Sequence, residues 1–477
     1  MSGERELSAR NISLGMIVAG MLVMAACSQL PSETSTAVIP LTPTVTTSPT
    51  PSPLPSWTPV PSPVPGGLYV DASQDLGPVN PLVYGSNYGP WIVVPAEMLP
   101  AAQAAHITYL RYPGGAFGDH NNLTHLDIDK FIAFARLMGA EANICVRLLD
   151  GTPEQAVDLL QYTRAQGYNV RYWSIGNEPN LYATMDQRPD YDTQRFNAEW
   201  RAIAQAMKAV DPNIILIGPD VSQYTANPAY NPHDRAGRDW LREFLIANGD
   251  LVDIVSIHRY PFPTGVSAPP PTIDDLRRNS PEWDETIPYL RQVIRETAGR
   301  DLPVAVTEVN SNWNKAGGGE ATPDSFYNAI WWADALGRMI RNGVDIVAQF
   351  NLVTTGNQGG WGLLARAEPR PTYYVYMLYQ RFGSQRVYAS FPEGYVSIYA
   401  ARRAEDGALT LMVINRGAEA ATPLLRLEGF TTDGAAETLL FDAGHPTVSE
   451  IAPSLIADGT TLELPPQSIT LYILPGK

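Results

Sequence analysis

The stretch RYWSIGNEPN, from Arg171 to Asn180, is a hydrophobic run that stops at turn-forming residues. Runs rich in Trp, Ile and Val that end at Asn, Gly or Pro are typical of buried β-strands that break into a loop. Asn177 and Glu178 lie at this break, directly before a proline. An acid at such a place is either part of a helix start, where the helix dipole favours it, or a reactive group.

Seven further apolar runs alternate with helical stretches between residues 67 and 383: LVYGSN, ITYLRYPGG, ANICVRL, NIILIGPD, VDIVSIHRY, LPVAVTEVN and VDIVAQFNL. The stretches between them, such as FNAEWRAIAQAMKAV, carry apolar residues at three- and four-residue spacing, as amphipathic helices do. Strands that are buried on both faces and alternate with helices indicate a parallel sheet, and eight such units predict a (β/α)8 TIM barrel. A doubly wound open sheet is the alternative, but no GxGxxG or Walker loop in the sequence supports it.

The pattern changes from residue 384 to the end of the chain, 384–477. Short runs such as LTLMVINRG, ETLLFDAG and SITLYILPG are separated by turn signals, which predicts a C-terminal antiparallel β-sandwich domain. The segment GGLYVDAS, at the start of the folded region, is expected to add a strand to this domain.

The N-terminal stretch ISLGMIVAGMLVMAAC resembles a bacterial lipoprotein signal over residues 1–27, with MAAC as its lipobox. This resemblance makes Cys27 the lipidated first residue of the mature chain. The alternative is an uncleaved anchor helix, although the run is shorter than the roughly 20 residues that span a bilayer. Residues 28–66 are rich in Pro, Thr and Ser and predict a semi-stiff linker. The protein is therefore expected to be exported and anchored to the membrane at the cell surface.

The composition limits the function classes. The chain has 477 residues and is 44% hydrophobic, enough for a large core and more than one domain. Its formal net charge of -16 argues against nucleic acid as a partner, and no protein partner is implied. Cys145 is interpreted as a core thiol. His120 and His125 suggest a metal, but without a matching third ligand a solvated loop is the favoured interpretation, and neither a metal nor a cofactor is expected.

Catalytic residues of a TIM barrel lie at the carboxyl ends of its strands. That rule selects Arg111, Asn177, Glu178, His258, Tyr260, Glu308, Asn351 and Trp361. The two acids, Glu178 and Glu308, are expected to face each other across the barrel mouth, and paired carboxyl groups are what the cleavage of a glycosidic bond requires.

Each of these residues also has a structural interpretation. Glu308 fits a salt bridge, His258 a buried hydrogen-bonded position, Tyr260 ordinary packing, and Arg111 the positioning of a neighbour. The aromatic residues are either platforms on which sugars stack or parts of the core; they are Trp361, Trp313, Tyr112 and Trp91.

Four motifs, LRYPGG, WSIGNEPN, SIHRYP and VTEVN, occur in this order and resemble the signature of clan A of the glycoside hydrolases, which are retaining enzymes. LRYPGG, YWSIGNE and RPTYYVYMLYQRFG most resemble family 51, the α-L-arabinofuranosidases, and GNEPN is similar to relatives in families 39 and 79. The resemblance implies that Glu178 is the acid/base, that Glu308 is the nucleophile, and that Asn177 binds the hydroxyl beside the reacting carbon.

The expected function is therefore that of a retaining glycosidase, with an α-L-arabinofuranoside as the first candidate substrate. β-Xylosidase, β-glucuronidase and endo-glucanase activities are the alternatives within the clan, and a non-catalytic surface lipoprotein that binds carbohydrate is the alternative of another class. Arg259 bears on this choice, because strand residues alternate in direction. If His258 points into the barrel, Arg259 points away, which favours a neutral sugar; turned inward, it would pair with a uronic acid.

Overall fold

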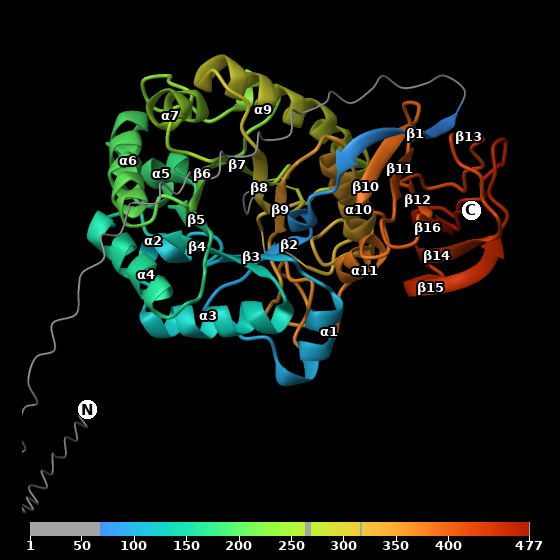
Figure 1. Cartoon of the computed structure of the whole chain (residues 1–477), viewed down its shortest axis with the longest axis horizontal. Helices are drawn as coiled ribbons and strands as arrows, with labels where there is room; N and C mark the ends of the chain where they lie inside the picture. Colours follow the sequence, from blue (N-terminus) through green and yellow to red (C-terminus); the bar gives the residue numbers. More distant parts are fainter. Residues whose placement is uncertain (1–66, 263–268, 315–316, 477) are drawn as a thin grey trace, which may run out of the picture. The chain divides into compact units, whose positions relative to one another are not determined.

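The computed structural model describes residues 67–262, 269–314 and 317–476, and within them a closed barrel of eight parallel strands (Figure 1). The strands are β2 (Gly85–Asn87), β3 (Tyr109–Tyr112), β4 (Glu141–Val146), β5 (Tyr172–Ile175), β6 (Ile215–Ser222), β7 (Ile254–Arg259), β8 (Val304–Val309) and β9 (Ile346–Gln349). Pairing of β2 with β9 closes the sheet. The predicted TIM barrel is confirmed, and the open sheet is excluded.

Helices cover the outside of the barrel, as Figure 1 shows. The longer ones are α3 (His125–Met138), α4 (Pro153–Ala165), α6 (Thr193–Val210), α7 (Trp240–Asn248), α9 (Trp283–Ala298), α10 (Phe326–Arg341) and α11 (Pro371–Tyr379). Shorter helices are α1 (Leu99–Ala104), α2 (Phe117–His120), α5 (Tyr182–Met185) and α8 (Ile273–Asn279). Local sequence fixes their ends. Thr124 and Thr152 form capping boxes at the starts of α3 and α4, and Gly139 ends α3 in a left-handed conformation with φ of 68°.

The second sheet has eight strands in the order β13-β1-β10-β11-β12-β16-β14-β15. Their bounds are β1 (Leu68–Pro78), β10 (Gln385–Ser390), β11 (Val396–Arg402), β12 (Leu409–Asn415), β13 (Leu425–Glu428), β14 (Ala436–Asp442), β15 (His445–Ser454) and β16 (Ser468–Leu474). All neighbours are antiparallel except β1 and β13. β1 comes from the first described residues and pairs with β10, so the sheet contains both ends of the described chain.

Helix α10 packs between the barrel and the second sheet, and almost all of its residues are buried. At its centre the fully buried Asp334 accepts hydrogen bonds from the hydroxyl groups of Ser397 and Tyr399, which belong to β11. Arg338 Nε donates to the same carboxylate at 2.9 Å, and Arg416 Nε lies 3.2 Å from it. Barrel and sheet therefore share a buried ionic contact.

The predicted signal peptide, the linker and Cys27 lie outside the described residues and stay predictions. Within the described residues, each helix is either too short or too polar to cross a bilayer. Cys145 lies in β4 and is 1% exposed, as expected of a core thiol.

Candidate active site

The loop after β5 holds Glu178 in an unusual conformation. Its backbone is left-handed, with φ of 48° and ψ of 53°, which is uncommon for a residue with a side chain. Two contacts fix the loop: Glu178 N donates to Asp220 O at 3.1 Å, and Asn177 N donates to the buried carboxylate of Asp119 at 2.8 Å. The Glu178 side chain makes no cap hydrogen bond to the short 3-10 helix that follows, so the helix-start interpretation does not account for it.

Glu308, near the end of β8, is buried with only 5% of the residue exposed. Its Oε2 accepts hydrogen bonds from Gly115 N at 3.1 Å and from Arg111 at 3.2 Å. Its Oε1 accepts one from the Tyr260 hydroxyl at 2.6 Å. Burial and the charge of Glu308 raise the pKa of Tyr260 well above its usual value, so this hydroxyl keeps its proton and donates. Three donors thus fix the orientation of the Glu308 carboxyl group.

Arg111, which is fully buried in β3, connects the polar groups beneath the mouth. Besides Glu308, it donates to Asn177 Oδ1 at 2.8 Å, to Asp220 Oδ2 at 3.1 Å and to Asn87 Oδ1 at 3.1 Å. Burial alone would raise the pKa of Asp220, but the charge of Arg111 and the contact with His258 lower it below its usual range. Arg111 thus contacts both Asn177 and Glu308, as the positioning role considered for it requires.

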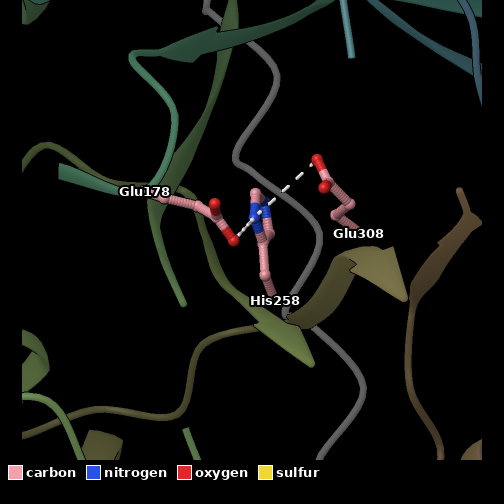
Figure 2. A group of neighbouring side chains, drawn as sticks. All are labelled: Glu178, His258 and Glu308. Atoms are coloured by element: carbon pink, nitrogen blue, oxygen red, sulfur yellow. Dashed lines mark hydrogen bonds and ion pairs between the residues drawn. The ribbon is translucent and has the colours of Figure 1, made fainter. Parts of the chain in front are cut away.

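His258 of β7 lies between the two glutamates, as Figure 2 shows. Its Nδ1 is 3.2 Å from Glu178 Oε1 and 3.9 Å from Glu308 Oε2, and its Nε2 is 3.7 Å from Asp220 Oδ1. Burial alone would lower the pKa of His258. The charge of Glu308 and the contacts with Asp220 and Glu178 outweigh burial and raise this pKa to about 9, so the imidazole is a cation at neutral pH.

The two carboxyl groups are close neighbours, because one oxygen of each and a nitrogen of His258 all lie within 4.8 Å of one another. Burial and the charge of Glu178 raise the pKa of Glu308. The charges of His258 and Arg111 act to lower this pKa, but they do not outweigh the other two effects. Burial also acts to raise the pKa of Glu178, but the hydrogen bond and charge of His258 lower it overall. In the empty site the two pKa values are therefore shifted in opposite directions, that of Glu178 down and that of Glu308 up.

These three side chains are also of types that bind metal ions. Histidine binds a metal through a neutral ring nitrogen, whereas His258 is protonated and enclosed by three acids. A metal would have to displace that proton, so the group fits proton transfer better than metal binding. His120 and His125 pair with different acids, Asp186 at 2.6 Å and Asp158 at 2.8 Å, and do not form a joint site with each other.

The remaining predicted residues differ in their surroundings. Asn351 is buried, and its Oδ1 has no hydrogen-bond partner within the described residues. Trp361 Nε1 donates to Asn312 O at 3.0 Å, and its ring lies 5.1 Å from that of Phe350. Substrate binding by Asn351 and Trp361 stays a prediction. Tyr112 is 2% exposed and stacks on Phe131 with ring centres 4.3 Å apart, so it belongs to the core.

Two buried acids that hold the loop with Asn177 and Glu178, Asp220 and Asp119, were not among the predicted site residues. Asp220 ends the run NIILIGPD, so the rule that selected the other strand-end residues applied to it as well. Asp119 lies in the short helix α2, so the strand-end rule does not select it. Its carboxylate accepts from backbone N–H groups of loops that are distant in the sequence.

Known proteins resemble this chain in sequence and in fold. Rat heparanase (Rattus norvegicus) is 24% identical over 307 residues, which are 60% of this chain and 54% of that protein. A β-xylosidase of Geobacillus stearothermophilus is 26% identical over 243 residues, 46% of this chain and 43% of that protein. The chain thus spans about half the length of the curated relatives it matches. The structure of an α-L-arabinofuranosidase from Thermotoga maritima aligns with a TM-score of 0.69 at 18% identity, over 86% of this chain and 99% of that one, and shares the fold.

The model of the family described as "Glycosyl hydrolases family 39" matches residues 162–408. This segment is more than half of the chain, and it contains Glu178, His258 and Glu308. The expected resemblance to clan A is confirmed, and family 39 was among its expected relatives. The chain therefore belongs to family 39 of the glycosyl hydrolases.

Proposed function

We propose that the protein is a retaining glycoside hydrolase in which Glu308 is the nucleophile and Glu178 the acid/base. The observation that carries this proposal is the spacing of the carboxyl groups, whose nearest oxygens lie within 4.8 Å at the ends of β5 and β8. Retaining enzymes hold the two groups about 5 Å apart, whereas inverting enzymes separate them by roughly 6.5–9.5 Å to admit a water molecule.

The first step transfers the sugar to the enzyme. A Glu308 oxygen bonds to the anomeric carbon, the bond from that carbon to the leaving oxygen breaks, and the proton of Glu178 passes to the leaving oxygen. Gly115 N–H, Arg111 and Tyr260 hold Glu308 for this attack. Asn177, fixed through its oxygen by Arg111, supplies an amide for the hydroxyl beside the reacting carbon.

The proton must lie on Glu178 before that step, although His258 lowers the pKa of Glu178 in the empty site. The low pKa of Glu178 depends on its contact with His258. A bound sugar draws Glu178 toward the glycosidic oxygen and shields it from water, and both changes raise this pKa. Once Glu178 is neutral, it no longer raises the pKa of Glu308. Substrate binding thus favours a protonated Glu178 beside an ionised Glu308, the pair of states that the first step requires.

The second step releases the sugar. After Glu308 has become an ester, its negative charge is gone and Glu178 can take a proton from water. The oxygen of that water bonds to the anomeric carbon, and the ester bond breaks. Both carboxyl groups then return to their starting states. The presence of both acids together with Asn177 supports an enzyme rather than a binding protein that has lost catalysis.

For the substrate we propose a neutral pentoside, α-L-arabinofuranoside first and β-xyloside second. The names of the relatives include β-xylosidase and probable α-L-arabinofuranosidase. Arg259, the residue considered for a uronic acid, donates to Glu282 at 3.1 and 2.7 Å and to Gln223 at 3.0 Å. A guanidinium paired in this way is not available to a sugar carboxylate, which supports a neutral substrate.

We propose further that Cys27 is lipidated and holds the enzyme at the outer cell surface, on the basis of the lipobox and the linker. Membrane fractionation of a Cys27→Ala variant tests this location. Activity that moves to the soluble fraction supports the lipid anchor, and activity that stays with the membrane supports the uncleaved helix.

Two measurements test the reaction. A panel of aryl arabinofuranosides, xylosides, glucosides and glucuronides identifies the sugar from the released aryl group. NMR of the first product on the best substrate is expected to show retained anomeric configuration, and an activated 2-fluoro glycoside of the same sugar is expected to label Glu308. Inversion, or a label on another residue, contradicts the double displacement. No release from any glycoside, with the protein folded, contradicts the assignment as an enzyme.

A further inference from the structure

On one half of the barrel mouth, the loop segments next to the strand ends carry no charge. The segments that directly follow β2, β3, β8 and β9 read YGPWIVVP (88–95), PGGAFG (113–118), NSNWN (310–314) and FNLVTTGNQGGW (350–361). They contain no Asp, Glu, Lys, Arg or His, and the charged residues of the β8 and β9 loops come later, from Glu320 and from Arg366 in the described chain. By contrast, residues 176–192 after β5 and residues 223–239 after β6 contain five such side chains each. The side of the mouth next to Glu308 therefore differs in chemistry from the side next to Glu178.

Five aromatic side chains of these segments form what we call the aromatic rim: Trp91, Phe117, Trp313, Phe350 and Trp361. Trp91 and Phe117 have ring centres 5.7 Å apart. The Phe350 and Trp361 rings meet edge to face at 5.1 Å, and Trp361 Nε1 donates to the carbonyl oxygen of Asn312, the residue before Trp313.

Gly115 links this rim to the reacting groups. A side chain on Gly115 would begin 3.5 Å from the Phe350 ring, and Gly115 N donates to Glu308 Oε2 at 3.1 Å. Phe117 follows only two residues later in the same loop. The aromatic rim therefore begins next to the carboxyl group proposed as the nucleophile.

The exposure of the tryptophans separates this rim from the core. Nine tryptophans lie in the described part of the chain, and six of them are at most 2% exposed: Trp173, Trp200, Trp240, Trp283, Trp331 and Trp332. The other three all belong to the aromatic rim. Trp91 is 38% exposed, Trp313 is 41% exposed, and Trp361 is half-buried. Exposed indoles are unfavourable in water, and when they gather beside a reactive site they indicate a surface that a ligand covers.

We propose that the aromatic rim binds further sugar units of a neutral oligosaccharide or polysaccharide, so that the substrate extends beyond the sugar at the cleaved bond. This inference rests on the proposed glycosidase function and specifies its substrate. A sugar ring presents a flat C–H face that packs on an indole, and its hydroxyl groups need neutral hydrogen-bonding partners such as the amides of Asn357 and Gln358 in the β9 loop. The absence of charge in the segments next to the strand ends favours a neutral chain over a uronic acid polymer.

The test compares an aryl monoglycoside with aryl glycosides of the matching xylo- or arabino-oligosaccharides of two to five sugars. In the wild type, kcat/KM is expected to rise with length. Trp91→Ala and Trp313→Ala are each expected to remove about three- to tenfold of that gain while leaving the monoglycoside unchanged. Trp91→Phe and Trp313→Phe should each retain part of the gain in kcat/KM with length. Tyr395→Ala, which removes an exposed aromatic ring from the second sheet, is the matched control and should change nothing.

The outcomes separate the two proposals. Hydrolysis of the monoglycoside with no gain from length, or a gain that survives both tryptophan variants, overturns the inference and leaves the proposed function intact. If no glycoside is cleaved, the proposed function fails, and calorimetric titration of the same unlabelled oligosaccharides decides on the aromatic rim. Binding that weakens in Trp91→Ala and Trp313→Ala supports the inference, and no binding by the wild type overturns it.

Discussion

The protein buries two networks of acids and arginines, and they differ in the balance of their charges. In the site network, the three acids Glu178, Asp220 and Glu308 surround the cations Arg111 and His258. In the second, which we call the clamp network, the carboxylate of Asp334 meets Arg338 and Arg416 and accepts hydrogen bonds from the hydroxyl groups of Ser280, Ser397 and Tyr399. Asp284, at the edge of this network, pairs with Arg338 and Arg341, so the cations outnumber the acids.

The difference in balance has a consequence for protons. Burial alone would raise the pKa of Asp334, but Arg338 and Arg416 lower it far below its usual range, so its carboxylate is ionised at neutral pH. In the site network the pKa of Glu308 is raised and that of His258 reaches about 9. The groups of the site network therefore set one another's pKa values, and a change in one of them changes the others. A network that joins domains has a fixed charge state, whereas one that catalyses acid–base chemistry needs a labile proton.

The largest effect is expected where the site network loses the proposed nucleophile. Glu308→Gln should lower turnover of an aryl glycoside by at least about 10⁴-fold, because an amide cannot form the glycosyl ester. The amide oxygen still accepts hydrogen bonds from its neighbours, so thermal unfolding should stay close to that of the wild type. Glu450→Gln, on the exposed β15, is the control for the charge change. Near-normal turnover in Glu308→Gln would remove this residue from the mechanism.

Glu178→Gln should cost less, about 10²- to 10⁴-fold, because it removes only proton transfer. The loss should be greater for a poor leaving group than for a dinitrophenyl glycoside, whose departure needs little help from an acid. Steady-state rates on the two substrates measure this contrast. An equal loss on both would contradict the role of Glu178 as the acid.

The clamp network should respond in stability rather than in rate. Asp334→Asn takes the carboxylate from the buried Arg416 and leaves Arg338 only that of Asp284, and it is expected to lower the free energy of unfolding by about 3–5 kcal/mol. Urea unfolding measures this loss, and kcat/KM at low temperature should remain within about twofold of the wild type. The exposed pair of Arg235 and Asp190 provides the control, since Asp190→Asn should cost less than about 1 kcal/mol. A large loss of kcat/KM in folded Asp334→Asn would mean that the two networks are coupled.

The contrast between the site network and the clamp network also shows which parts of the molecule the sequence could predict. The barrel follows from continuous apolar runs, because a strand buried on both faces has no polar side to alternate with. The strand-end rule then selects Glu178, His258 and Glu308. The clamp network was not predictable, because Asp334 lies within a helix and its partner hydroxyl groups are distant in the sequence, Ser280 by 54 residues and Ser397 and Tyr399 by more than 60. The exposure of Trp91 and Trp313 was not predictable either, because side-chain burial depends on the packing of loops that close the barrel.

Asp220→Asn should change the titration of the site network. Asp220 raises the pKa of His258, so its removal should lower that pKa from about 9. A group whose pKa is higher in the folded state stabilises the fold below its unfolded pKa, near 6.5, and loses this contribution as pH rises through its folded pKa. The stability advantage of the wild type over the variant should therefore be full below pH 6.5 and should shrink toward pH 9, by about 1.4 kcal/mol for each pKa unit lost.

Urea unfolding at several values between pH 6 and pH 9.5, with NMR titration of the imidazole, measures this shift. The control is Asp442→Asn, which removes the acid 2.9 Å from the exposed His445 on the second sheet and should leave the titration of His258 unchanged. A stability advantage that stays constant over this range would show that Asp220 does not set the charge of His258.

The smallest effect is expected at Arg259, which marks where the site network ends. Arg259 follows His258 in β7, but its guanidinium turns to Glu282 and Gln223. Arg259→Ala should therefore change kcat/KM by less than about twofold on each aryl glycoside and cost about 1 kcal/mol of stability, as a partly exposed ion pair does. The ratio of glucuronide to arabinofuranoside hydrolysis is the decisive measurement, with Arg235→Ala as a control on a surface arginine. A selective loss of glucuronide hydrolysis would show that Arg259 leaves Glu282 to bind a sugar carboxylate, which would replace the neutral substrate by an acidic one.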